Sequence, residues 1–128
     1  ALLYYDKQYD EAEKILREAL TFMPYSKKLI FPFCEIIMFR KGYTKEVDEL
    51  LNRAFLYFPY DTLAILEMLK YTLAQKDYEK YAFFSYIYGL RNHSMDDLIN
   101  AKNVYERLGK KDMAKRVEKS INNQGHNL

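Results

Sequence analysis

The stretch YDEAEKILREALTFMPYS, residues 9–26, returns in altered form 35 residues later as TKEVDELLNRAFLYFPYD, residues 44–61. A third copy, shifted by the same 35 residues, places Ala82, Tyr86 and Gly89 at matching positions. A fixed period of this length is typical of repeat arrays, and apolar residues at three- and four-residue spacing predict helices rather than strands. Five pairs of positions correspond in the first two copies: Ala12 with Val47, Leu16 with Leu51, Ala19 with Ala54, Pro24 with Pro59, and Ser26 with Asp61.

The spacing and its interruptions predict where the helices lie. An N-terminal half-unit, ALLYYDKQ, should precede a helix over 10–22, whose inner side is expected to include Ile15. Pro24 ends this helix, and Ser26 can cap the next one by accepting a backbone N–H bond, as Asp61 can later in the chain. The remaining helices are expected over 27–41, 44–57, 62–75, 78–91, 95–108 and 111–122.

Other helix ends are indicated by single residues. Gly42 and Gly109 can end helices in a left-handed conformation, and Ser94 begins a sequence typical of a capping box. Pro32 falls inside the helix expected over 27–41, where it removes a backbone hydrogen bond. Either that helix is kinked at Pro32, which is the interpretation we favour, or it starts near Phe31 with the proline in its first turn.

Composition limits the class of protein. The 128 residues suit one domain, residues 1–122, followed by a frayed tail over 123–128. A net charge of +2 provides no strong field for nucleic acid or an anionic membrane, and the lack of a long uncharged apolar run predicts no membrane span. One cysteine excludes an internal disulfide framework. Because the chain starts as if inside a helix, we expect a fragment of a larger protein, and cytoplasmic and bacterial periplasmic locations both stay open.

The repeated positions resemble those of the tetratricopeptide repeat (TPR) family. Its pattern is a small residue, a large one four positions later, a small one three further on, and a closing proline; the first two copies follow it, and the third has Ser94 in place of the proline. The resemblance implies a right-handed α-solenoid of antiparallel helix pairs, with about three and a half repeats. It also implies a scaffold for protein–protein interaction, in which the first helix of each pair lines a concave groove.

The sequence departs from the family pattern in two ways. The expected first turn, residues 6–8, has no glycine, and the period is 35 rather than the family's usual 34. A period of 35 also fits the pentatricopeptide family, which reads single-stranded RNA. That function needs polar base-reading residues and a basic groove, whereas Phe31, Leu66 and Ala101 stand at the equivalent positions here, so nucleic acid is the less favoured partner.

The resemblance places a set of residues in the groove. They form an apolar and aromatic N-terminal end and a mixed-charge C-terminal end, which suits an amphipathic helix or an extended peptide of another protein or of the parent chain. The alternative for Ile36 and Phe39 is a place in the core between helices. The groove candidates are Tyr4, Tyr5, Pro32, Ile36, Phe39, Arg40, Glu67, Tyr71, Gln75, Lys102 and Glu106.

A second candidate interface lies in the segment YEKYAFFSYIYGL, residues 78–90, which is apolar on every side. A helix of this kind is normally buried all round, yet the outer face of a second helix usually meets water. Tyr81, Phe84 and Tyr88 form the face in question. Either an extra element covers them, a partner chain such as a second copy packs there, or the tyrosines lie at the surface.

Residues for chemistry are few, and we expect neither an enzyme nor a cofactor or metal. His93 and His126 have no acidic or cysteine neighbour at ligand spacing, and Cys34, in an apolar helix, should be a buried, inert thiol. A basic cluster on the last helix indicates a solvated capping face, with contact to a phosphate or lipid headgroup as the alternative. This cluster comprises Lys110, Lys111, Lys115, Arg116 and Lys119.

Overall fold

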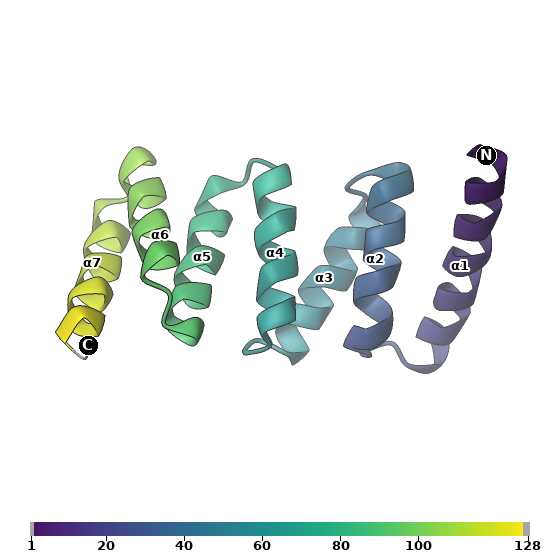
Figure 1. Cartoon of the computed structure of the whole chain (residues 1–128), viewed down its shortest axis with the longest axis horizontal. Coiled ribbons are helices and arrows are strands. Elements are labelled where there is room, and N and C mark those ends of the chain that lie inside the picture. Colours follow the sequence, from purple (N-terminus) through teal and green to yellow (C-terminus); the bar gives the residue numbers. More distant parts are fainter. Residues whose placement is uncertain (1, 127–128) are drawn as a thin grey trace. The chain divides into compact units, whose positions relative to one another are not determined.

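The computed structural model describes the backbone of residues 2–126 and the side chains of residues 7–124, and its regular elements in that part of the chain are all α-helices. The prediction of an all-α protein is therefore confirmed. From residue 27 onward every predicted helix starts within one residue of its observed start. The helices are α1 (Leu2–Phe22), α2 (Lys27–Lys41), α3 (Lys45–Tyr57), α4 (Thr62–Ala74), α5 (Tyr78–Asn92), α6 (Met95–Arg107) and α7 (Lys111–His126) (Figure 1).

Two predicted helix boundaries are wrong. The half-unit and the helix expected over 10–22 form one continuous helix, α1, without a turn at residues 6–8. Those residues include neither glycine nor proline, so nothing in the local sequence ends the helix. At the other end, α7 continues to His126, beyond residue 122, where this helix was predicted to end.

The helices group into two compact units, residues 1–59 and 60–128. In the first unit, α2 packs against both α1 and α3, and successive helices run in opposite directions (Figure 1). The buried residues of this unit include Phe33 and Ile37 of α2 and Val47, Leu51 and Ala54 of α3. The prediction that Ile15 lies on the inner side of α1 is wrong, because its side chain is 65% exposed; among the side chains of α1 that the structure describes, Leu20 is the buried one.

In the second unit, α5 packs against α4 and α6, and α6 packs against α7. The buried positions of the repeat pattern explain how closely these helices approach. A Cβ atom added at Gly89 would lie 2.8 Å from the side chain of Leu98 and 3.0 Å from its backbone nitrogen. Glycine therefore allows α5 to approach the start of α6. The core cluster of this unit consists of Ala82, Leu98, Ala101, Tyr105, Ala114 and Val117.

Short polar side chains stabilise the starts of α3, α4 and α6. Asp61 accepts a hydrogen bond from the backbone N–H of Ala64 at 3.1 Å, and Thr44 accepts one from Val47 at 3.3 Å. The Ser94 hydroxyl accepts a long bond, 3.4 Å, from the N–H of residue 97 and donates to its carboxylate at 2.6 Å. The predicted cap at Ser26 is wrong, because only its backbone carbonyl, and not its side chain, accepts bonds from the following turn.

Glycine and proline account for other local features of the backbone. Gly42 directly follows α2 and Gly109 is the second residue after α6; both have positive φ, 80° and 74°, where a residue with a side chain would be strained. Pro32 lies inside α2, which begins at Lys27, so the alternative start near Phe31 is wrong. No helix within the described residues is both long enough and apolar enough to cross a membrane.

Candidate functional surfaces

The groove candidates of the first unit form an apolar stripe along α2. Pro32 and Phe39 are exposed, and Ile36 between them is half-buried. Because they lie four and three residues apart, all three share one side of the helix. The ring of Phe39 is 74% exposed, and its centre is 5.2 Å from that of Tyr9 on α1. The interpretation of Phe39 as interhelical core is therefore wrong.

Arg40 lies beside this stripe, but its charge is already matched. Its guanidinium contacts the carboxylate of Asp10, and it lies 3.6 Å from that of Glu13; both acids belong to α1. Lys41 approaches Glu13 as well, at 3.7 Å. These ion pairs connect α1 to the end of α2. A ligand would therefore meet Arg40 as a neutralised group.

The groove candidates of α4 differ in exposure. Gln75 is exposed and Tyr71 is half-buried, whereas Glu67 is buried and lies 3.5 Å from the amine of Lys70. Glu67 therefore presents little surface to a ligand, in contrast to its predicted place in the groove. The side chains of Tyr4 and Tyr5, also predicted there, lie outside the described residues.

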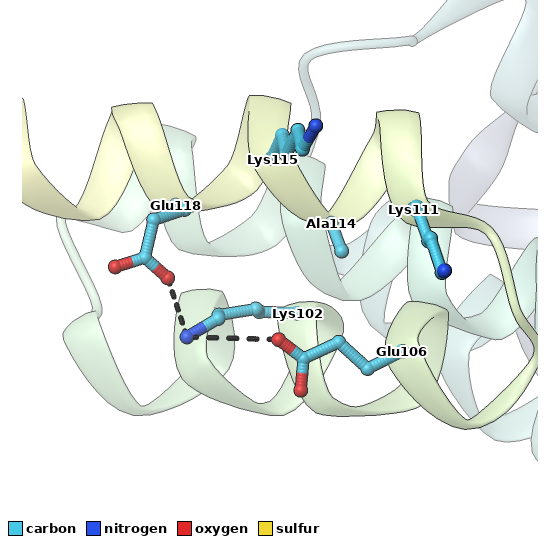
Figure 2. Close-up of a pocket in the computed structure, with 6 residues that line it drawn as sticks. All are labelled: Lys102, Glu106, Lys111, Ala114, Lys115 and Glu118. Atoms are coloured by element: carbon cyan, nitrogen blue, oxygen red, sulfur yellow. Dashed lines mark ion pairs between the residues drawn. The ribbon is translucent and has the colours of Figure 1, made fainter.

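Lys102 and Glu106 of α6 line a depression of about 360 Å³ together with α7. Figure 2 shows the amine of Lys102 between the carboxylates of Glu106 and Glu118. Its distance to Glu106 is 3.7 Å, and it contacts Glu118 directly. The hydrogen bond to Glu118 raises the pKa of Lys102 above its ordinary value. The charges of Lys102, Glu106 and Glu118 are thus matched with one another, and Lys111 and Lys115 are the remaining charged residues that line the depression (Figure 2).

The second candidate interface is only partly at the surface. Phe84 is 5% exposed, so it belongs to the interior, and its ring meets that of the exposed Phe83 edge-on at 5.4 Å. Of the alternatives left open for this face, exposure at the surface is therefore wrong for Phe84, which is covered. Tyr81 and Tyr88 are half-buried, and the hydroxyl of Tyr81 accepts a hydrogen bond from an amide on α6.

Phe83 and Leu90 of α5 are exposed, as is Tyr78 at its start. Phe83 and Leu90 were not among the interface candidates predicted from the sequence, although their spacing of seven residues places both on one side of the helix. The spacing in the sequence does group them, together with Ile87, as one apolar face of this helix. Spacing does not show that the side of α5 with Phe83 and Leu90 is exposed while the side with Phe84 is buried.

A depression of about 510 Å³ in the second unit was not found from the sequence. Parts of α4, α5 and α6 line it, and most of its wall is apolar or aromatic. One polar group in it is positioned by the protein itself: the Asn100 amide donates hydrogen bonds to the Tyr81 hydroxyl at 3.1 Å and to the Ser85 hydroxyl at 3.2 Å. Its lining residues are Leu73, Tyr78, Tyr81, Asn100, Val104, Arg107 and Leu108.

An exposed apolar surface at the ends of α1 and α3 was also missed. Phe22, which is 85% exposed, and Met23 end or follow α1, and Leu56 and Tyr57 end α3. The rings of Tyr25 and Tyr57 lie 4.3 Å apart between centres, which connects the two helix ends. These residues belong to the two copies of the repeated stretch, but the repeat alone does not distinguish its exposed members from its buried ones.

The described residues offer no constellation for metal chemistry. No three His, Cys, Asp or Glu side chains among them could together hold a metal ion. His93 follows α5 in a left-handed conformation, and the side chain of His126 lies outside the described residues. Cys34 is fully buried, as expected.

Comparison with family models, with curated proteins and with solved structures found no match. The similarity to tetratricopeptide repeats accordingly depends on the sequence pattern and remains a prediction.

Proposed function

We propose that this chain is a protein-interaction module of the tetratricopeptide type, a right-handed stack of about three and a half helix pairs that holds a peptide or helix of a partner. The observation that carries the proposal is the stripe of Pro32, Ile36 and Phe39 on α2. Apolar side chains at helical spacing that are exposed or partly exposed are typical of surfaces for an amphipathic helix or an extended peptide. Phe39, supported by Tyr9, is its aromatic anchor.

The experiment selects peptides from a phage-displayed library on the purified chain. The best synthetic peptide is then labelled with fluorescein, and its Kd is measured by anisotropy. Phe39→Glu should raise this Kd at least about tenfold, because a charge would replace the anchor. Its thermal unfolding midpoint should barely change, because the ring is largely exposed.

The matched control is Phe22→Glu, which makes the same change at a still more exposed phenylalanine outside the stripe. It should leave the Kd unchanged. If Phe39→Glu binds the peptide as well as the wild type does, the stripe is not the binding surface. A fluorescein-labelled oligouridine serves as the RNA probe; binding that falls steeply between about 50 and 200 mM salt would favour nucleic acid instead.

A second candidate function is self-association through α5. Phe83 and Leu90 favour it, because both are exposed and lie on the same side of this helix. Sedimentation velocity of the wild type and of Phe83→Glu distinguishes the possibilities. A wild type that stays monomeric at about 100 µM excludes a dimer of ordinary affinity.

A further inference from the structure

We infer that the depression between α4, α5 and α6 binds an acidic amphipathic segment of a partner protein, with an apolar side chain in the depression and an Asp or Glu side chain on Arg107. This inference goes beyond the proposed function, because the surface is separate from the stripe on α2. Its volume, about 510 Å³, falls within the range of about 300–1,000 Å³ usual for ligand pockets.

The depression lies on a different side of its helices from the predicted groove. An α-helix turns by about 100° per residue. Two residues, or about 200°, separate Val104 in the depression from both Lys102 and Glu106 on α6. The same separation holds on α4 between Leu73, which lines the depression, and Tyr71. A ligand here would therefore leave the groove candidates of α4 and α6 uncovered.

The wall provides an apolar anchor site with polar groups at defined places. The side chains of Leu73, Tyr78 and Leu108 are all exposed. Asn100 uses its amide N–H groups for Tyr81 and Ser85, which holds the polar side of the depression in one arrangement. A few placed polar groups within an apolar lining are typical of binding sites.

Charge identifies the ligand. Arg107 makes no ion pair or side-chain hydrogen bond with any residue that the structure describes. Its positive charge lies in the last turn of α6, where it interacts favourably with the helix dipole, but the N–H donors of its guanidinium have no acceptor among the described residues. The nearby acids at the start of α5 are already matched, Glu79 with Lys110 at 3.8 Å and Asp77 with Lys80 at 3.9 Å. The positive charge left over beside an apolar depression complements a carboxylate next to an apolar side chain.

The test uses an array of short peptides that are acetylated and amidated, so that side chains carry their only carboxylates. Each has a central Leu or Phe, one Glu at one to four positions from it, and Ser, Ala or Gly elsewhere. The best binder is measured by fluorescence anisotropy beside its Glu→Gln and Leu→Ser or Phe→Ser versions. Both changes in the peptide should weaken binding by roughly tenfold or more.

Protein variants locate the site. Arg107→Gln should lower the affinity for the Glu peptide by about tenfold and abolish its advantage over the Gln version, because the paired charge is gone. Leu73→Gln should weaken both versions equally. The matched controls are Arg116→Gln, an exposed arginine on α7, and Leu63→Gln, an exposed leucine of α4; both should bind as the wild type does.

Several results would overturn the inference. These are the absence of any binding below about 1 mM, equal binding of the Glu and Gln peptides, and binding that Arg107→Gln and Leu73→Gln leave unchanged. Phe39→Glu should not affect these peptides. Its effect on the library-selected peptide is a separate measurement, so either proposal can fail without the other.

Discussion

Gly89→Ala tests whether close approach of α5 and α6 explains the small residues of the repeat. In an exposed helix this substitution stabilises a protein by about 0.5–1 kcal/mol, because alanine loses less backbone entropy. Here the added methyl group would lie 2.8 Å from the Leu98 side chain and 3.0 Å from its backbone nitrogen. Overpacking of this kind costs about 1–3 kcal/mol, and rotation of the leucine cannot relieve the backbone contact. We therefore expect a net loss of about 1–2 kcal/mol.

Urea unfolding followed by far-UV circular dichroism measures this loss. With an m value of about 2 kcal/mol/M, the midpoint should fall by roughly 0.5–1 M. Asn103→Ala is the control, because this exposed residue of α6 reports the gain in helix propensity alone and should raise the midpoint slightly. In a Leu98→Ala background the cost of Gly89→Ala should shrink, because part of the clash has been removed. A rise in midpoint for Gly89→Ala in the wild-type background would refute the close approach.

Three further predictions concern stability. Leu51→Ala, at a fully buried position of α3, should cost about 2–5 kcal/mol in urea unfolding, and a cost below about 1 kcal/mol would contradict its place in the core. Burial raises the pKa of Tyr105 in the folded protein above its unfolded value of about 10, because it disfavours the ionised phenolate. The stability that depends on the neutral hydroxyl is therefore complete below the unfolded pKa and is lost as pH rises through the folded pKa. Thermal melts of Tyr105→Phe should therefore fall less above pH 10 than those of the wild type, and parallel curves would exclude this cause. The hydrogen bonds from Arg17, 2.7 and 3.1 Å long, lower the pKa of Glu46 in the folded protein. Their contribution to the free energy of unfolding is therefore present above the unfolded pKa of about 4.3 and is lost as pH falls through the folded pKa. Because both side chains are nearly half exposed, Glu46→Gln should cost at most about 1 kcal/mol at pH 7 and nothing near pH 2, and an equal cost at both values would contradict the ion pair.

Most helix positions could be predicted from the sequence, because their signals are local. Pro24, Pro59 and Asp61 act within one turn of their own position, and each lies at a helix boundary in the structure. The errors came where such signals were missing. No residue at positions 6–8 ends α1, and the half-unit was separated only by analogy with the repeat.

The candidate surfaces were harder to predict. Spacing correctly placed Pro32, Ile36 and Phe39 on one side of α2, but it left open whether that side was core or surface. On α5 the sequence showed three apolar faces, and the structure buries Phe84 while it exposes Phe83, its neighbour in the chain. The partner of Arg40 lies 30 residues away on another helix, so no local pattern could reveal that its charge is matched.

By itself, the sequence determined that the chain is helical, where most helices begin and end, and which residues share a side of each helix. These properties follow from contacts within a few residues along the chain. Only the tertiary structure decided which sides are covered, which charges are paired, and that Leu73, Val104 and Arg107 line one depression. The physical reason is that burial and pairing depend on neighbouring helices that bring together residues far apart in the sequence.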